Sequence, residues 1–148
     1  MTGPAFAVLV VEDSDEDFDT VLEVLQTLGL GGRVRRATTG DHCLALLRGQ
    51  AGRIALQPGF VLLDLNLPGL DGRDTLAEIR GDATLARLPV VVLSTSADPR
   101  DVAHCYARGA NAYHVKPTSY PDYIQLLLRL LGYWLVEVVL PDPRGGRP

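Results

Sequence analysis

Four separate segments of the chain carry side chains that could together bind and transfer a phosphoryl group. Glu12 and Asp13 directly follow one apolar run, Asp64 lies at the end of another, and Ser94 ends a third. Of the 14 lysine and arginine residues, only Lys116 is a lysine, and it directly precedes a proline. These segments hold no catalytic histidine, cysteine pair or glycine-rich phosphate loop. They therefore indicate carboxylate chemistry around a cation.

Several carboxylates gathered at one place need a positive charge between them. Two carboxylates about 4 Å apart repel each other by about 4 kcal/mol at an effective dielectric constant near 20. Mg²⁺ would neutralise them, since it binds one or two carboxylates, keeps several waters and accepts phosphate oxygens. A carboxylate beside such an ion can attack phosphorus and form an aspartyl phosphate. Lys116 would add a compact charge, whereas the planar fork of an arginine would compete with the metal for a whole carboxylate.

The elements that position these side chains alternate regularly between apolar runs and amphipathic segments. Continuous or alternating apolar patterns predict five strands, and a helical periodicity of apolar residues predicts five helices. The expected strands are residues 6–11, 33–38, 60–65, 89–94 and 111–115. The expected helices are residues 15–28, a segment from the capping Thr39 to near Gly49, about 74–80, about 99–108, and a long last helix with Pro121 in its first turn.

Strand and helix alternating five times predict an open α/β fold with a parallel sheet and right-handed crossovers. Binding sites in such sheets lie outside the carboxyl ends of the strands. Glu12, Asp64, Ser94 and Lys116 each come at such an end. The sequence therefore predicts that they converge on one edge of the sheet.

The overall composition is that of one globular domain. The chain has 148 residues, of which 47% are hydrophobic, and a formal net charge of −4. This charge and the lack of a basic patch argue against nucleic-acid binding. The absence of a signal peptide or a long apolar stretch argues against membrane insertion. Cys43 and Cys105 are isolated, which indicates two free thiols in a reducing cytoplasm.

The motifs VLVVEDS, LLDLNLPGLDG, VVLSTSA and YHVKP resemble, in this order, the four signatures of response-regulator receiver domains in bacterial two-component signalling. The resemblance covers roughly residues 6–131. It implies a flavodoxin-like fold with five parallel strands in the order 2-1-3-4-5 and helices on both faces. We expect a receiver domain over residues 5–131 and an extension over residues 132–148 that forms a dimer and is disordered at its last residues.

The resemblance also implies a metal site and a phosphoacceptor. Asp64 would accept the phosphoryl group from a histidine kinase, with Mg²⁺ as the cofactor. Asp13 and Asp64 would bind the metal directly, Glu12 would act through water, and the backbone carbonyl of Asn66 would complete the site. Glu12 stands where aspartate is more frequent in the family. We expect a phosphoacceptor signalling protein with slow self-dephosphorylation rather than an enzyme.

Three further residues receive roles from the same resemblance. Ser94, where threonine is more frequent, would hydrogen-bond a phosphoryl oxygen. Lys116 would contact Asp64 before phosphorylation and the phosphoryl group afterwards. Tyr113 would be the switch aromatic that turns inward when Ser94 moves, although a partly buried strand aromatic is the rival reading. The Lys116–Pro117 peptide would be cis, a form that only proline makes accessible.

Other functional classes fit the residues less well. The DLN sequence of residues 64–66 is similar to the DxD motif of aspartate-nucleophile phosphatases, but those enzymes place it after their first strand and need a second acid. A flavin-binding relative would need a hydroxyl-rich loop after the first strand, where the chain has EDSDED. A calcium loop beginning at Asp13 would need glycine and glutamate where Phe18 and Val24 stand.

The last helix and the following VEVVLP segment carry two apolar stripes. One stripe, expected to face the core, consists of Ile124, Leu127, Leu128, Leu131 and Leu135. The other consists of Tyr120, Tyr123, Leu126, Leu130, Tyr133 and Trp134. A surface helix needs only one apolar side, so we expect the second stripe to form a symmetric homodimer. The alternative is that the segment folds back on its own domain.

The helix and its YWL…VVLP extension, together with the other motifs, resemble the single-domain regulators paired with bacterial phytochromes. Since only a short segment follows the last helix, we do not expect a DNA-binding transcription factor. The resemblance implies that a histidine kinase of phytochrome type is the partner. The alternative is a phosphorelay carrier that serves a kinase unrelated to light.

Overall fold

Five parallel strands in the order β2-β1-β3-β4-β5 form the sheet of the computed structural model, which describes residues 6–50 and 52–141. The strands are β1 (Phe6–Val11), β2 (Val34–Ala37), β3 (Pro58–Leu63), β4 (Val90–Ser94) and β5 (Ala112–Val115). The helices are α1 (Asp15–Thr27), α2 (Gly40–Arg48), α3 (Gly72–Gly81), α4 (Pro99–Ala107) and α5 (Tyr120–Gly132), with a 3₁₀ turn, η1 (Gly31–Arg33), and a π-helical turn, η2 (Tyr133–Glu137). The predicted flavodoxin-like fold is confirmed.

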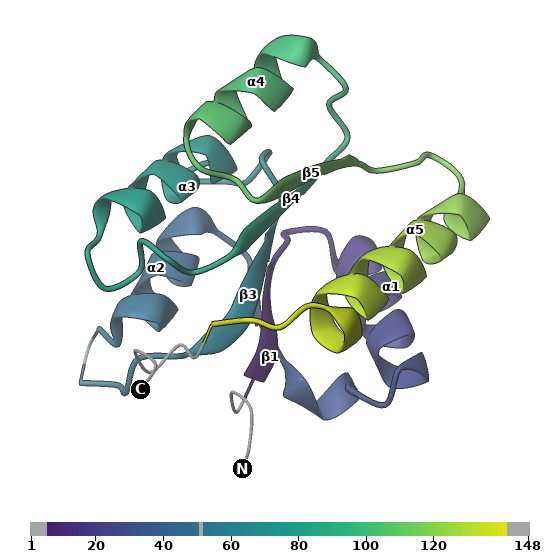
Figure 1. Ribbon diagram of the computed structural model, residues 1–148, viewed down its shortest axis with the longest axis horizontal. Helices are drawn as coiled ribbons and strands as arrows, with labels where there is room; N and C mark the ends of the chain where they lie inside the picture. The colour runs from purple at the N-terminus through teal and green to yellow at the C-terminus, as the bar shows by residue number, and fades with distance from the viewer. Residues whose placement is uncertain (1–5, 51, 142–148) are drawn as a thin grey trace.

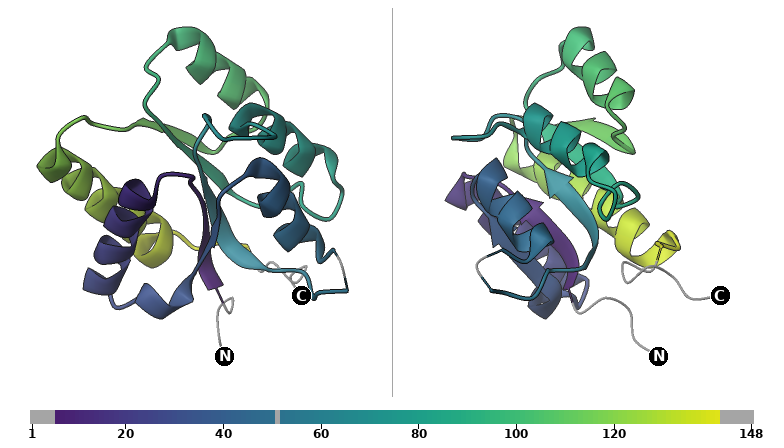
Figure 2. Two further views of the ribbon diagram at one scale, coloured as in Figure 1. Left: turned by 180° about the vertical axis from the view of Figure 1, so that it is seen from behind. Right: turned by 90° about the vertical axis from the view of Figure 1, so that its left-hand side faces the viewer.

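The sheet separates two layers of helices (Figures 1 and 2). Helices α1 and α5 cover one face, and α2, α3 and α4 cover the other. All residues of β3 and β4 are buried, because these two strands lie in the interior of the sheet with both faces covered. The edge strands β2 and β5 are mostly half-buried. The helices leave the carboxyl ends of the strands uncovered. We call this end of the sheet its open edge.

Side chains that precede each helix fix where it begins. The hydroxyl of Thr39 accepts a hydrogen bond from the backbone of His42, as predicted, and Gly49 ends α2 in a left-handed conformation. Asp71, which the sequence indicated only as a turn residue, caps α3 by accepting hydrogen bonds from the backbone of Arg73 and Asp74. As a result α3 begins at Gly72, two residues earlier than expected. The carboxylate of Asp71 thus stabilises the first turn of α3.

The structure contradicts the predicted division of α5 into an inner and an outer stripe. Tyr123 and Leu130, predicted to face a partner, are buried in the chain's own core at 6% and 3% exposure. Ile124 and Leu128, predicted to face the core, are only partly buried. Adjacent helical residues lie only roughly 100° apart around the axis, so two apolar stripes in neighbouring columns cannot be ranked by periodicity alone.

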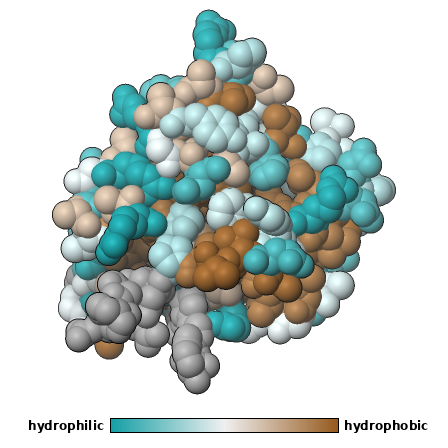
Figure 3. Space-filling model, viewed as in Figure 1, coloured by the Kyte–Doolittle hydropathy of each residue, from teal (hydrophilic) through white to brown (hydrophobic). Residues whose placement is uncertain are grey.

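The segment after α5 packs partly against its own domain. Trp134 stacks on Phe60, with 5.8 Å between the ring centroids, and Leu140 packs against the same cluster as α1 and α5. Tyr133, by contrast, remains 57% exposed and Val139 95% exposed. Figure 3 shows apolar side chains gathered over the end of α5 and the segment that follows it. The last residues predicted to be disordered, 142–148, lie outside the described residues.

Among the described residues, we find no helix with the length and apolar character that crossing a bilayer requires.

Gly72 offers a test of how tightly α3 packs beneath the open edge. A β-carbon at this position would overlap the backbone carbonyl of Asp64. We expect Gly72→Ala to lower the free energy of unfolding by about 1–3 kcal/mol, because the strand end has to shift. Gly81→Ala at the other end of α3 is the matched control, since nothing lies within 4 Å of the added carbon. Chemical denaturation of both variants measures the effect, and equal stabilities would contradict the packing argument.

Candidate functional site

Main-chain hydrogen bonds at the strand ends bring the predicted residues together. The backbone N–H of Asp64 donates to the carbonyl of Val11 over 3.1 Å, which sets the acid after β3 beside the acids after β1. The backbone N–H of Lys116 donates to the carbonyl of Ser94 over 2.7 Å, which does the same for β5 and β4. The sheet itself therefore assembles the site, as the sequence predicted.

Lys116 lies at the centre of the site and is 8% exposed. Its Nζ atom lies 2.6 Å from Oε1 of Glu12, 2.9 Å from Oδ2 of Asp17 and 3.5 Å from Oδ2 of Asp64. The sequence predicted the contact with Asp64, which is present as the longest of the three ion pairs. In this state the ammonium is hydrogen-bonded mainly to Glu12 and Asp17.

Asp17 was missed as a site residue, because Asp15, Glu16 and Asp17 all read as acids that favour a helix N-terminus. The side chains of these three acids point in different directions from α1. Asp17 lies three, four and seven residues before the buried Thr20, Val21 and Val24, so it shares the inner face of α1. The helical position of Asp17 was therefore a usable signal. Asp15, in contrast, points outward and pairs with Arg36.

The buried charges perturb one another. Burial raises the pKa of Glu12 to about 7, against the opposing effect of the hydrogen bond from Lys116. Burial would lower the pKa of Lys116, but the hydrogen bond and charge of Glu12, together with Asp64 and Asp17, outweigh it and raise that pKa. We conclude that Lys116 carries its positive charge, because three carboxylates face a single amine.

A second group of carboxylate oxygens can hold a metal ion. One oxygen from each of Glu12, Asp13 and Asp64 lies within 4.8 Å of the other two. Glu12 and Asp64 are buried, and Asp13 is exposed at the mouth of the cluster. This set of hard oxygen donors fits a divalent cation that also keeps waters, such as Mg²⁺ or Mn²⁺. Asn66 is exposed nearby, and its backbone N–H donates to Oδ1 of Asp64 over 3.3 Å.

Ser94 and Tyr113 are both connected to Ser96. Ser94 is fully buried, and its hydroxyl oxygen accepts a hydrogen bond from the backbone N–H of Ser96 over 3.1 Å. The hydroxyl of Tyr113 donates to the carbonyl of Ser96 over 2.8 Å. Tyr113 is half-buried and packs against the core. A displacement of the segment after β4 would therefore reach both side chains.

The same segment is tied to two helices through Asp101 of α4. The hydroxyl of Ser96 donates to Asp101 over 2.6 Å, and Arg73 of α3 pairs with Asp101 at 2.9 Å. Arg73 also pairs with Asp71, the cap of its own helix. The sequence did not identify this network. Asp71 and Ser96 lie within the quoted motifs, but no spacing in the sequence connects them to Arg73 or Asp101.

The peptide bond that follows Lys116 differs from the expectation. The Lys116–Pro117 peptide is trans, so the prediction of a cis bond is wrong for this structure. Proline only reduces the preference for trans to about 0.5–1 kcal/mol and does not reverse it.

The buried hydroxyl of Tyr123 has no hydrogen-bond partner among the described residues. Burial raises its pKa, and the positive charge of Lys116 opposes this effect.

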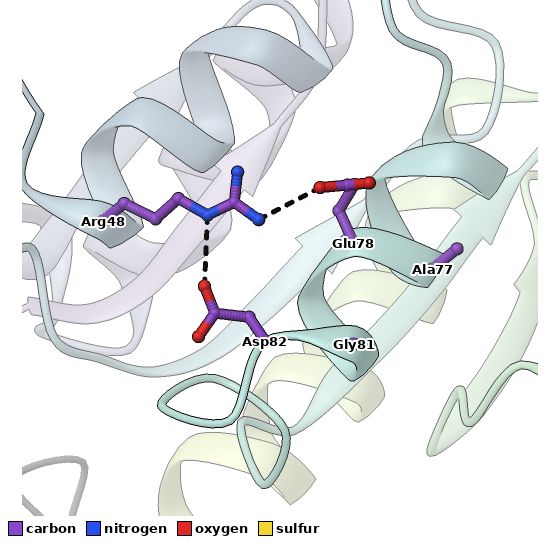
Figure 4. A pocket seen from close by; sticks show the side chains of 5 residues that line it. All are labelled: Arg48, Ala77, Glu78, Gly81 and Asp82. Atoms are coloured by element: carbon purple, nitrogen blue, oxygen red, sulfur yellow. Dashed lines mark hydrogen bonds and ion pairs between the residues drawn. The ribbon is translucent and has the colours of Figure 1, made fainter.

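A shallow pocket between α2 and α3 lies away from this edge (Figure 4). Arg48 binds Glu78 and Asp82 across it, both at 3.1 Å. This guanidinium is already paired with two carboxylates. We therefore interpret the residues around the pocket as a structural link between α2 and α3. The candidate functional side chains are those at the open edge of the sheet.

Comparison with known proteins agrees with this geometry. Residues 8–128 match the response regulator receiver domain family. Response regulator Rcp1 of Synechocystis sp. is 38% identical over 151 aligned residues, which cover 95% of this chain and 96% of Rcp1. The probable methanogenesis regulatory protein FilR2 of Methanothrix harundinacea is 35% identical over 93% of this chain and 89% of its own length.

Solved structures show the same similarity. The crystal structure of the Mn²⁺-bound form of Rcp1 has a TM-score of 0.87 and 37% identity, covering 92% of this chain and 99% of Rcp1. The phosphorylated cyanobacterial phytochrome response regulator RcpA has a TM-score of 0.86 and 36% identity, covering 95% and 99% of the two chains. With a family match over most of its length and relatives of this identity, the chain belongs to the response regulator receiver domain family and is a response regulator.

Proposed function

We propose that this response regulator accepts a phosphoryl group on Asp64 from a histidine kinase, with Mg²⁺ as the cofactor. The observation that carries the proposal is the position of Asp64 at the open sheet edge, beside two other carboxylates and 3.5 Å from the ammonium of Lys116. A carboxylate in such a position is set up for attack on phosphorus. A cytoplasmic location belongs to the same proposal and agrees with two buried, free cysteines.

In the transfer step, a carboxylate oxygen of Asp64 attacks phosphorus in line with the leaving nitrogen of the kinase phosphohistidine. The new P–O bond forms as the P–N bond breaks, and the electron pair of that bond stays on the imidazole, which leaves neutral when its other nitrogen is protonated. Lys116 and the hydroxyl of Ser94 would hold the oxygens of the transferred group. Little other chemistry is required of the protein, because phosphoryl transfer depends mainly on positioning and charge.

Asp13 and Asp64, with the backbone carbonyl of Asn66, would hold Mg²⁺, and Glu12 would contact it through water. The ion supplies positive charge to the phosphoryl oxygens when bound. The oxygen cluster of Glu12, Asp13 and Asp64 supports this proposal, as does the Mn²⁺-bound form of the relative Rcp1. The chain would act as a phosphoacceptor that hydrolyses its own aspartyl phosphate slowly, rather than as an enzyme on other substrates.

We further propose that phosphorylation is read out through Ser94 and Tyr113. If Ser94 moves toward the phosphoryl group, it leaves the backbone N–H of Ser96, to which it is hydrogen-bonded here. Tyr113 is attached to the carbonyl of the same residue and would follow its movement. The surface formed by α4, β5 and α5 would then differ between the two states.

The partner kinase is proposed to be of phytochrome type. The support is the likeness to RcpA, whose description names it a cyanobacterial phytochrome response regulator. FilR2, which is described as a methanogenesis regulatory protein, is nearly as similar over almost the same share of the chain. A phosphorelay role with a kinase unrelated to light is therefore the alternative that the test must separate.

Phosphotransfer measures the acceptor and the partner together. A phytochrome-type kinase and an unrelated histidine kinase, each labelled with radioactive phosphate, would be mixed with the wild type and with Asp64→Asn. We expect rapid transfer from the phytochrome-type kinase to the wild type, and none to Asp64→Asn, because its amide is not a nucleophile toward phosphorus. Label on Asp64→Asn at normal stoichiometry would show another acceptor. Equal rates from both kinases would remove the phytochrome pairing.

Magnesium binding should appear as stabilisation. A ligand that binds only the folded state adds about 2.7 kcal/mol to the free energy of unfolding at a concentration of 100 times its Kd. We expect MgCl₂ to raise the thermal midpoint of the wild type, and Asp13→Asn to lose most of this gain. Asp19→Asn, a change at an exposed position on α1, should keep it. Identical responses of the two variants would exclude Asp13 as a ligand.

The proposed homodimer now has a smaller set of contacts. Tyr120 and Tyr133 are more than half exposed, Leu126 is half-buried, and Val136 and Val139 are exposed in the segment that follows α5. Tyr123 and Leu130 are removed from the interface because they are buried in the core. Trp134 keeps only the part of its ring that Phe60 leaves uncovered.

Mass measurement in solution tests the dimer. We expect the wild type to sediment as a dimer at micromolar concentration. Tyr133→Glu should yield monomers, since a two-fold axis would bring two like charges close together. Ile54→Glu is the control, because Ile54 is 96% exposed in the connection between α2 and β3. A monomeric wild type, with or without a phosphodonor, would rule the dimer out.

A further inference from the structure

We propose that Asp17 is a positioning residue that holds the ammonium of Lys116 on the α1 side of the site and competes with the phosphoryl group for it. The holding role concerns the unphosphorylated protein and stands alone. The competition rests on the proposed function, because it requires a phosphoryl group on Asp64. Asp17 would thus set how readily the site passes from its resting to its phosphorylated arrangement.

The first support is the order of the three distances. Nζ of Lys116 is 2.9 Å from Asp17 but 3.5 Å from Asp64, and only the contacts with Asp17 and Glu12 are hydrogen bonds. Asp17 belongs to a helix, whereas Glu12 and Asp64 follow strands. The ammonium is therefore drawn away from the acid that would carry the phosphoryl group.

The second support is that the position of Asp17 is fixed by its own backbone. Its N–H donates to the hydroxyl of Ser14, the N-cap of α1, over 3.2 Å. The carboxylate is therefore presented to Lys116 from a capped first turn. A general effect on the helix dipole does not explain this direction, because Asp15 and Glu16 occupy the same turn and are exposed.

The third support is the difference in burial among the partners of Lys116. The side chain of Asp17 is 33% exposed, against 5% for Glu12 and 10% for Asp64. An ammonium has three donors, and phosphoryl oxygens on Asp64 would add further acceptors. Water can replace the ammonium more readily at the partly exposed Asp17 than at the buried Glu12. Asp17 is therefore the contact that Lys116 gives up.

Lys116 can be observed directly because it is the only lysine in the chain. Protein labelled with ¹³C,¹⁵N-lysine has a single labelled side chain in its NMR spectrum. We would compare the wild type, Asp17→Asn and Asp19→Asn without metal or phosphodonor. The ε-CH₂ and ammonium signals should shift in Asp17→Asn, with faster exchange of the ammonium protons, and should overlay the wild type in Asp19→Asn. Spectra of Asp17→Asn that match those of the wild type would refute the holding role.

The competition is tested by phosphorylation with phosphoramidate and Mg²⁺, followed by intact mass. We expect Asp17→Asn to be phosphorylated about two- to fivefold faster than the wild type, the factor expected for loss of a partly exposed ion pair. Asp19→Asn removes the same charge from the same helix and should leave the rate unchanged. An unchanged or slower rate in Asp17→Asn, or an equal gain in Asp19→Asn, would overturn the competition. If even the wild type takes up no phosphate, the proposed function fails with it, and the spectra alone decide the holding role.

Discussion

The ammonium of Lys116 is the interaction on which the open edge of this sheet depends. Glu12 and Asp64 are buried carboxylates, and two buried like charges at such a place are unstable without a cation between them. Among the described residues, Lys116 is the cation within ion-pair distance of both. Removing it would leave these two buried acids to bind a metal ion or to force the strand ends apart. The positive charge of Lys116 therefore stabilises this end of the sheet and is also the charge that the proposed phosphoryl transfer would use.

Much of this arrangement could be predicted from the sequence, because strands buried on both faces are written as continuous apolar runs. The runs before Glu12, Asp64 and Ser94 each end abruptly in polar residues, and parallel strands place such ends at one edge. The single lysine after the fifth strand was predicted to join these polar residues at the same edge. The physical reason for this success is that the site follows from topology and register, which local patterns determine.

What the sequence left open depends on side-chain direction or on comparisons between similar patterns. Asp17 is one of three consecutive acids, and only its angular position on α1 separates it from its neighbours. Tyr123 and Leu130 belong to one of two adjacent apolar stripes of similar strength, and the structure alone decides which stripe the core takes. The link between Tyr113 and Ser96 joins residues on different elements, and no spacing in the sequence reports it.

The geometry also explains why the site uses a lysine where the rest of the chain uses arginine. One nitrogen of Lys116 meets three carboxylates that approach from a helix and two strands. A guanidinium spreads its donors over a fixed planar fork, whereas the three carboxylates here converge on one nitrogen atom. A single ammonium on a flexible stem can also exchange one carboxylate for a phosphoryl oxygen without moving the backbone, which the hydrogen bond to the carbonyl of Ser94 holds in place. The proposed exchange of partners over a fixed backbone therefore suits a small, rotatable charged group.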